Sequence, residues 1–377
     1  MRIIHTADWH LGKTLKNQSL IEDQKYILDE FLKLLDDTKP DAVIIAGDIY
    51  DRAIPTVDAI NLLDEIIDKL VERKIPLLCI SGNHDSAERL NFGSKLFARS
   101  NFFINTKPVE NPAPVVLSDK FGEVYFSLIP FFEAAEIKNL FAQDNLDVNA
   151  ANKFYIAECR KKIPANKRSV AVAHLFAAGG LTSESERKFV GAIENVDVAN
   201  FANYNYTALG HLHKPQTMKK TDYVVRYSGS LLKYSFDEAK YNKGVTLIEI
   251  DGAGKTSFEH IDLKPRRDVR IVEGTVDELK NSARTTDYIY ANLTDKNHVL
   301  YAMEKLRDSA FPNILSVQFV NLERKIESSA RMFDKTENVS VLENFADFFE
   351  FETGEKLTGE YRQAMEKFLS KLESEQQ

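Results

Sequence analysis

Apolar and polar positions alternate in blocks along the first 210 residues of the chain. Short apolar runs are separated by segments in which apolar residues recur at helical spacing. This succession of strands and helices is typical of an α/β layered fold. We therefore predict an α/β fold for this part of the chain, with the apolar runs as its strands.

The apolar runs end in aspartate, asparagine or histidine. They read RIIH before TADWH, DAVIIAGD, PLLCISGNHD, SVAVAH and YTALGHLH. Ligands of open α/β sheets bind outside the carboxyl ends of the strands, so five such ends at one edge would form a single polar site. Six of the eight histidines lie in these segments: His5, His10, His84, His174, His211 and His213.

Each segment alone also has an ordinary structural explanation. Asp8 and His10 belong to residue types that are common in loops, and Gly-Asp is common turn chemistry. His174 at a strand end would by itself more often pack in a core than bind a ligand. The strongest single motif is GHLH, because alternate residues of an extended chain face the same way and let His211 and His213 converge. The order of all five motifs favours one common site.

The strand ends supply carboxylate, amide and imidazole donors. The seven donors are Asp8, His10, Asp48, Asn83, His174, His211 and His213. They are too many for one tetrahedral zinc ion but suit two adjacent ions of higher coordination, and the lack of thiolate favours Mn²⁺ or Fe²⁺, with Zn²⁺ as an alternative. Two cations about 4 Å apart can activate water and neutralise phosphate oxygens. The pattern therefore predicts phosphoester hydrolysis.

The segments DWHLG, GDIYD, GNHDS, AVAH and GHLHKP together resemble the DNA-repair nuclease branch of the calcineurin-like metallophosphoesterase superfamily. The resemblance covers essentially the whole chain. It implies a four-layer β-sandwich flanked by helices, with a small α+β capping domain and C-terminal helices. It also implies exonuclease and hairpin endonuclease action on DNA in repair, recombination and replication.

The resemblance also divides the ligands between two divalent metal ions. It implies that the first ion is bound by Asp8, His10, Asp48 and His213. It implies that the second is bound by Asp48, Asn83, His174 and His211, with Asp48 as the bridge. Manganese is the metal expected first, and iron, zinc and magnesium are the alternatives.

His84 and Asp85 are the candidate catalytic residues. His84 follows Asn83 directly, so we expect it beside the metal ions, where it can protonate the departing sugar oxygen. Histidine, with an ordinary pKa of about 6.5, suits a general acid at neutral pH, and Asp85 is expected to favour the imidazolium. The resemblance gives His84 the same role. Archaeal and eukaryotic relatives carry a histidine where this chain has Asp51 and Arg52, so the role of that histidine is not carried over.

Composition limits the partners. The chain has 377 residues and a net charge of −8, which argues against bulk attraction to nucleic acid. Basic clusters at 160–168, at 219–220 with Arg226, and at 264–267 are candidate DNA contacts, although such clusters are usually solvated surface. Cys79 and Cys159 do not resemble a disulfide framework, which fits a reducing cytoplasm. Because the N-terminus has no signal-peptide pattern and no apolar run is long enough to span a membrane, we expect a cytoplasmic protein without a membrane anchor.

We predict three regions: a nuclease domain over 1–265, a capping domain over 266–325 and C-terminal helices over 335–377. The second should contain strands within 269–276, 287–294 and 314–320 and helices at 276–283 and 298–308. Nothing in this region resembles a metal site.

Three apolar stripes at helical spacing are candidate interfaces. In the helix within 55–74 the stripe is Val57, Ile60, Leu63, Ile67 and Leu70. In the two terminal helices, separated around Gly354 and Gly359, the stripes are Val341, Leu342, Phe345, Phe348 and Phe349, and Tyr361, Met365, Phe368 and Leu369. Packing inside the protein explains each stripe at least as well from the pattern alone. The resemblance implies a homodimer through nuclease-domain helices and a coiled-coil ATPase partner held by the terminal helices.

Two other functions fit part of the pattern. One is another calcineurin-like hydrolase that acts on nucleotides, phosphoproteins or cyclic nucleotides, and the capping-like region argues against it. The other is a non-catalytic scaffold, but here all the ligand positions are filled. The sequence contains no GxxxxGK[ST] motif, so any use of ATP must come from the partner.

Overall fold

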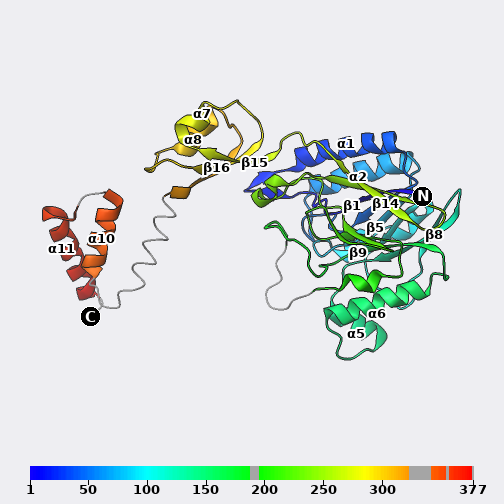
Figure 1. The fold of residues 1–377 in the computed structure, drawn as a ribbon. Coiled ribbons are helices and arrows are strands. Elements are labelled where there is room, and N and C mark those ends of the chain that lie inside the picture. Colours follow the sequence, from blue (N-terminus) through cyan, green and yellow to red (C-terminus); the bar gives the residue numbers. More distant parts are fainter. Residues whose placement is uncertain (187–194, 322–340, 354–355, 376–377) are drawn as a thin grey trace.

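The computed structural model describes residues 1–186, 195–321, 341–353 and 356–375 (Figure 1). The described residues up to Asp262 form a large domain built around two six-stranded sheets. The predicted α/β fold is therefore confirmed, and its strand ends are positioned by the order of the strands in these two sheets.

The first sheet has the strand order β14-β13-β1-β4-β5-β6. Its strands are β1 (Arg2–Thr6), β4 (Ala42–Ala46), β5 (Leu77–Ile80), β6 (Phe102–Asn105), β13 (Gly244–Ile250) and β14 (Thr256–Asp262). The strands from β1 to β6 in this order are parallel, whereas β13 and β14 add an antiparallel hairpin beside β1. The carboxyl ends of β1, β4 and β5 consequently lie on one side.

The second sheet has the order β11-β12-β10-β9-β8-β7. Its strands are β7 (Val115–Asp119), β8 (Gly122–Ile129), β9 (Arg168–His174), β10 (Tyr206–Gly210), β11 (Gln216–Lys220) and β12 (Val224–Tyr227). The four inner strands are parallel, and β7 and β11 close the edges as antiparallel strands. β9 and β10 are neighbours, so their carboxyl ends also lie together.

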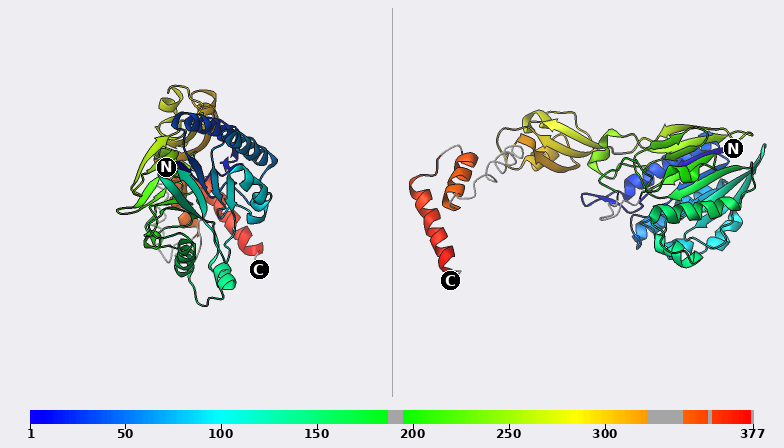
Figure 2. Two further views of the ribbon diagram at one scale, coloured as in Figure 1. Left: turned by 90° about the vertical axis from the view of Figure 1, so that its right-hand side faces the viewer. Right: turned by 60° about the horizontal axis from the view of Figure 1, so that its bottom comes forward.

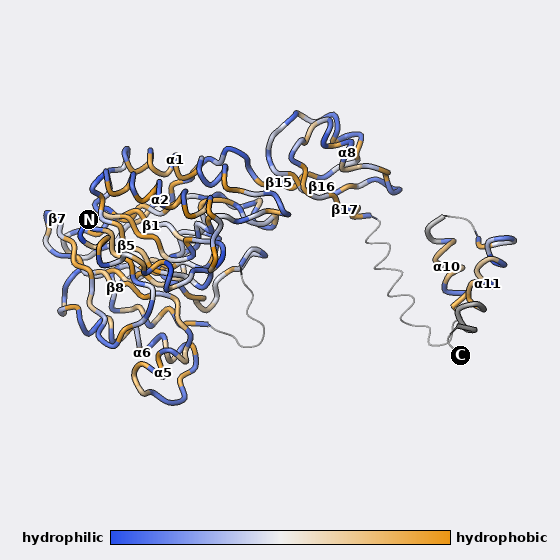
Figure 3. The backbone as a smooth tube through the Cα atoms, turned by 180° about the vertical axis from the view of Figure 1, so that it is seen from behind, coloured by the Kyte–Doolittle hydropathy of each residue, from blue (hydrophilic) through white to orange (hydrophobic). Residues whose placement is uncertain are grey.

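The strands pack on both faces because their side chains alternate between two cores. In β4, Ile44 points to the core between the two sheets, which also holds Val172 of β9, and Ile45 points to the core beneath the helices. The outer faces are covered by α1 (Ile21–Thr38) and α2 (Val57–Glu72) on the first sheet and by α5 (Ala134–Phe141) and α6 (Val148–Lys161) on the second (Figure 1). Figure 3 shows apolar stretches along the central strands. The expected four-layer arrangement is confirmed.

Short elements connect these layers. They are β2 (Thr14–Leu15), β3 (Gln18–Ser19), α3 (Ala87–Asn91), α4 (Ser94–Phe97) and the 3-10 helices η1 (Ala98–Ser100), η2 (Val198–Phe201) and η3 (Phe236–Lys240). Cys79 and Cys159 are buried free thiols, as expected. Within the described residues, no helix is long and apolar enough to cross a membrane.

Residues 269–319 form a small α+β domain with a core of its own, seen beside the large domain in Figure 2. It contains β15 (Val269–Gly274), α7 (Val276–Lys280), β16 (Tyr288–Leu293), α8 (Ala302–Asp308) and β17 (Ile314–Phe319), and its three strands are parallel in the order β15-β16-β17. The predicted strands and helices are confirmed, with both helices shorter than expected. The boundary predicted at residue 265 stays a prediction, and those at 325 and 335 lie outside the described residues.

A buried aspartate joins the small domain to the large one. The carboxylate of Asp23 in α1 accepts two hydrogen bonds from Arg267, at 2.8 and 2.7 Å, and one from the hydroxyl of Tyr288 in β16, at 2.7 Å. Lys233 of the large domain adds an ion pair with Asp268 at 2.8 Å. Within the basic segment 264–267, Arg267 is therefore engaged at this junction.

The terminal helices are α10 (Val341–Thr353) and α11 (Gly359–Glu375), as the aromatic spacing predicts. The ring centroids of Phe349 in α10 and Tyr361 in α11 lie 5.8 Å apart, so part of each stripe faces the other helix. Phe348 and Phe368 remain more than half exposed. The expected break at Gly354 lies outside the described residues.

Candidate metal centre

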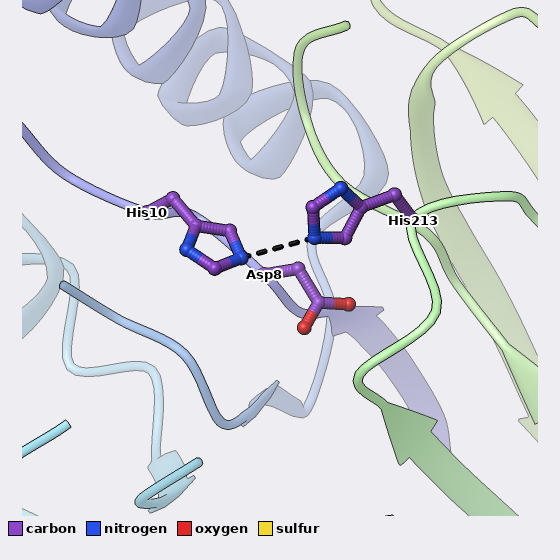
Figure 4. Close-up of side chains that lie close together, drawn as sticks. All are labelled: Asp8, His10 and His213. Atoms are coloured by element: carbon purple, nitrogen blue, oxygen red, sulfur yellow. Dashed lines mark hydrogen bonds between the residues drawn. The ribbon is translucent and has the colours of Figure 1, made fainter. Parts of the chain in front are cut away.

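The polar strand ends meet at one rim of the large domain. β1, β4 and β5 deliver their ends from the first sheet, and β9 and β10 deliver theirs from the second. The expectation of five strands at the edge of one sheet is therefore corrected: the rim is shared by both sheets of the sandwich. Residues that are 203 positions apart in sequence become neighbours there, such as His10 and His213 (Figure 4).

A first group of donors comprises Asp8, His10 and His213, whose ligand atoms all lie within 4.8 Å of one another. The two imidazole Nε2 atoms are 3.0 Å apart (Figure 4). Two such nitrogens either share a proton or face a common cation. Asp8 Oδ2 is buried and has no hydrogen-bond partner within the described part of the chain. Because buried polar atoms are rarely left unpaired, this group fits a metal ion.

A second group comprises Asp48, His174 and His211, again within 4.8 Å of one another. Asn83 Oδ1 joins them at 2.9 Å from His211 Nδ1 and 3.0 Å from His174 Nε2. Asp48 Oδ2 lies 3.3 Å from His174 Nε2 and 3.6 Å from His10 Nε2. Asp48 thus stands between the two groups, in the position that a bridging carboxylate requires.

Four of these residues adopt a left-handed backbone conformation. The φ angles are 54° at Asp8, 44° at His10, 49° at Asp48 and 106° at His211. Such conformations cost on the order of 1–3 kcal/mol each for residues with side chains, and they cluster at functional sites. Backbone hydrogen bonds hold the turns, because the amide of Asp8 donates to Gly47 and that of His10 to Asp48. The fold therefore imposes the direction in which these side chains leave the strands.

Two glycines are required where strand ends approach each other closely, Gly210 between the two sheets and Gly82 within the first sheet. A Cβ atom at Gly210 would lie 1.8 Å from the carbonyl oxygen of Ala46, and one at Gly82 would lie 2.2 Å from Asp48 Oδ1. Both distances are far below contact distance. The glycines of GHLH and GNHD therefore let the ends of β10 and β5 approach the end of β4 until the donor groups meet.

Surrounding groups orient the ligands. The backbone carbonyl of Ala46 lies 2.8 Å from His174 Nδ1, which leaves Nε2 for the metal side. Gln24 donates to the carbonyl oxygens of Trp9 and His10 and fixes the DWH turn. Outer contacts of this kind set the ring orientation of metal-binding histidines.

Burial perturbs the pKa values of the cluster. Burial raises the pKa of Asp8 to about 7, although His174 and His213 oppose the rise. Burial would lower the pKa of His174, but the carboxylate of Asp48 raises it to about 9. Burial lowers the pKa of His211 to about 3. Acids and bases thus compete for protons in one buried cluster, and divalent cations displace such protons because carboxylates and neutral imidazoles are their ligands.

His84 lies where the sequence predicts, beside the donors. Its amide donates to Asp48 Oδ1 at 2.9 Å, and its ring centroid is 4.8 Å from that of His10. Nδ1 of His84 lies 2.8 Å from the carbonyl oxygen of Asp51, which fixes the ring and leaves Nε2 as the nitrogen for proton transfer. The side chain is half-buried, so a substrate can approach it.

Asp85 has different partners from those expected. Its carboxylate accepts hydrogen bonds from the backbone amides of Gly82, Ile49 and Tyr50 at 2.9 to 3.1 Å. These bonds tie the loop after β4 to the loop after β5. Asp85 thus organises the backbone around the site, and the carbonyl of Asp51, not the Asp85 carboxylate, holds the His84 ring.

Sequence reasoning assigned no role to several residues around the site. Asp51 pairs with Lys13 at 2.8 Å, and its Oδ1 is 3.6 Å from His10 Nδ1. Asp51 is the last residue of GDIYD and Lys13 directly follows DWHLG, so both could have been found by proximity. Glu238 contacts His213 from behind, with Oε1 3.3 Å from Nδ1, and the segment SFDEAK around it carries no recognisable motif.

Several candidate DNA contacts serve the fold instead. Arg168 is buried and pairs with both oxygens of Asp119, at 2.6 and 2.9 Å. Arg226 is also buried and donates to the hydroxyls of Thr246 and Thr217. Both arginines are therefore withdrawn as DNA contacts, together with Arg267 at the domain junction.

The chain resembles proteins of known class. A family model described as calcineurin-like phosphoesterase matches residues 1–215. A protein from Staphylococcus epidermidis, named as the SbcD component of the nuclease SbcCD, is 36% identical over 353 residues, covering 92% of either chain. One of the same name from Staphylococcus saprophyticus is 37% identical over 382 residues, covering 99% of this chain and 98% of its own. Among solved structures, a dimetal phosphatase from Danio rerio aligns with 70% of this chain and 99% of its own, at 11% identity and a TM-score of 0.41.

Proposed function

Because the chain belongs to the calcineurin-like phosphoesterases, and within them to the SbcD components of SbcCD nucleases, we propose that it hydrolyses DNA phosphodiesters at a two-metal centre. Exonuclease action on duplex ends and endonuclease action on hairpins are both part of the proposal, as is work with an SbcC ATPase in double-strand-break repair. Manganese is the metal that we expect at the site.

The observation that carries the proposal is the pair of donor groups that share Asp48. One group offers Asp8, His10 and His213, and the other offers His174 and His211 with Asn83. Oxygen and imidazole donors without thiolate suit divalent manganese or iron. When bound, two such ions would supply Lewis acidity toward a phosphate and lower the pKa of water.

The chain itself contributes orientation and a proton. His84 Nε2 would carry the proton that the departing sugar oxygen requires, since Nδ1 is engaged with Asp51. Asp85 holds the two loops that bring His84 and Asp48 together. Holding the reacting groups in the required geometry lowers the activation barrier. A general acid adds about 10²- to 10⁴-fold in rate.

The proposal is tested by comparing substrates. Purified protein with Mn²⁺ should cleave linear duplex DNA and DNA hairpins, and chelation should stop the reaction. It should turn over nucleotides, phosphopeptides and cyclic nucleotides poorly. Faster turnover of one of those small phosphoesters than of DNA would assign the site to another calcineurin-like hydrolase, and inertness toward all substrates despite metal binding would indicate a scaffold.

We propose that the protein forms a homodimer through an apolar face of the large domain. Helix α2 packs on its sheet through buried side chains such as Leu63 and Leu70. Its other apolar side chains, Val57 and Ile60, are exposed. Ile60 lines a cavity of about 220 Å³ together with Phe92, which is 85% exposed. A single exposed apolar residue is ordinary, but a cluster around a cavity is typical of an interface.

Glutamate at position 60 or 92 is expected to dissociate this dimer. Burying an unpaired carboxylate costs several kcal/mol, so the dissociation constant should rise on the order of 100-fold or more. Light scattering with size exclusion would measure the mass of Ile60→Glu and Phe92→Glu. Val116→Glu, on an edge strand, is the matched control, and unchanged mass of all three variants would reject this face.

We also propose that α10 and α11 dock onto the SbcC ATPase. The exposed side chains of Phe348 and Phe368 give the helix pair an apolar surface. Amphipathic helices place such an apolar surface in a hydrophobic groove of the partner. The double variant Phe348→Glu with Phe368→Glu should lose co-elution with the ATPase, whereas its Mn²⁺-dependent DNA cleavage alone should persist. Leu300→Glu, an exposed apolar site in the small domain, serves as control; retained co-elution of the double variant would exclude this surface.

A further inference from the structure

The metal ligand His213 is held from behind by a polar cluster that the proposed reaction does not use. Its Nδ1 lies 2.6 Å from the hydroxyl oxygen of Ser185 and 3.3 Å from Oε1 of Glu238. Ser185 in turn donates to the same Oε1. Glu238 is fully buried, so solvent does not compete for these contacts.

The charge of Glu238 is balanced inside the protein. The ammonium of Lys243 lies 2.5 Å from Oε2 of Glu238 and also donates to the carbonyl of His213 at 2.6 Å. Ser183 and Ser235 donate to Oε1 at 3.1 and 3.0 Å. A buried carboxylate with this many partners has a single orientation, because moving it would leave several polar groups unpaired.

This cluster determines which nitrogen of His213 faces the other ligands. With Nδ1–H donating to Ser185 and Glu238, the lone pair resides on Nε2, 3.0 Å from Nε2 of His10. Metal-binding histidines commonly donate their second N–H to a carboxylate, which fixes the tautomer and ring direction. We propose that Glu238 is a positioning residue for His213, and that it acts from a helix which the small domain also contacts.

The helix in question is η3, which carries Glu238. Its first residue, Phe236, packs against Tyr290 of β16 with ring centroids 5.2 Å apart. Lys233, just before η3, donates to the carbonyl of Ala239 within it and pairs with Asp268 at the domain junction. One short element thus touches the ligand on one side and the small domain on the other. The position of the small domain consequently affects the orientation of His213 in the donor group of Asp8, His10 and His213.

The test measures metal binding and rests on the two-metal centre proposed above. Calorimetric and electron-paramagnetic titration with Mn²⁺ should resolve two sites in the wild type. In Glu238→Gln, one site should weaken by about 10- to 100-fold while the other keeps its affinity. Glu259→Gln makes the same carboxylate-to-amide change at an exposed position of β14 and should behave as wild type. Two wild-type affinities in Glu238→Gln would overturn the positioning role.

Two further variants are less disruptive to folding than Glu238→Gln. One of them also tests the contact between η3 and the small domain. Ser185→Ala removes the bridging hydroxyl, leaves the Lys243 pair intact and should weaken the same site severalfold. Tyr290→Ala, which leaves Glu238 and its partners in place, should do so too; if only Tyr290→Ala is silent, the coupling to the small domain is rejected and the positioning role stands. Wild-type protein that fails to bind two ions would instead contradict the proposed function itself.

Discussion

Replacing Asp48 by asparagine is expected to abolish DNA cleavage and to weaken both metal sites at once. Asp48 lies between the groups, with Oδ2 3.3 Å from His174 Nε2 and 3.6 Å from His10 Nε2. An amide keeps the shape of the side chain but removes its charge. Since bound cations supply several kcal/mol of transition-state stabilisation, kcat/KM should fall by roughly 10³-fold or more.

Titration with Mn²⁺ measures the effect of Asp48→Asn independently of turnover. Loss of affinity at both sites is the result that a shared ligand requires, whereas loss at one site would make Asp48 an ordinary ligand of that ion alone. Asp37→Asn, at an exposed position near the end of α1, controls for the general loss of one negative charge. Two intact sites in Asp48→Asn would remove the bridge from the mechanism.

The convergence of the candidate donors was predictable because each of them lies at or just past the end of an apolar run. Each apolar run predicts a strand from local sequence alone, and a residue that follows a strand lies at the edge of the sheet. In GHLH, for example, both histidines reach the site, but their division between the two donor groups was implied by the resemblance and not by the spacing. The aromatic spacing of α10 and α11 is local in the same sense. Such features need no knowledge of which strands pair.

The division of the strands between two sheets was not predictable in this way. β1 pairs with β13, although almost the whole sequence of the large domain lies between these two strands. No local pattern specifies that partner. The same limit applies to charge. Arg168 belongs to a run of cations in sequence, yet it is the first residue of a buried strand and pairs with Asp119. Whether a cation is solvated or buried depends on the tertiary fold.

Neighbours in sequence can also point in opposite directions. Asp85 follows His84, which suggested an acid supporting a histidine, but its carboxylate binds backbone amides of the loops. The group that supports the His84 ring is a carbonyl of Asp51, 33 residues earlier. Glu238 lies 25 residues beyond His213 in a 3-10 helix, where composition gives no signal. Contacts around a site are thus set by packing and appear only in the folded chain.

Replacing His84 by alanine is expected to leave two Mn²⁺ sites and to slow cleavage of a DNA hairpin by about 10²- to 10⁴-fold. The backbone amide of His84 donates to Asp48, and that contact survives in the variant. The lost group is the imidazole held by Asp51, which would protonate the departing sugar oxygen. The measurement compares single-turnover cleavage by wild type and variant with and without the SbcC ATPase. His298→Ala, in the small domain, is the matched control.

A substrate with a better leaving group separates proton donation from positioning. Nitrophenolate leaves without needing a proton, so His84→Ala should cleave a bis(p-nitrophenyl) phosphodiester nearly as well as wild type while it fails on DNA. An equal loss on both substrates would mean that the ring positions the substrate or the metal ions. Undiminished cleavage of the hairpin would remove His84 from the reaction, and the proton would have to come from solvent at the half-exposed rim.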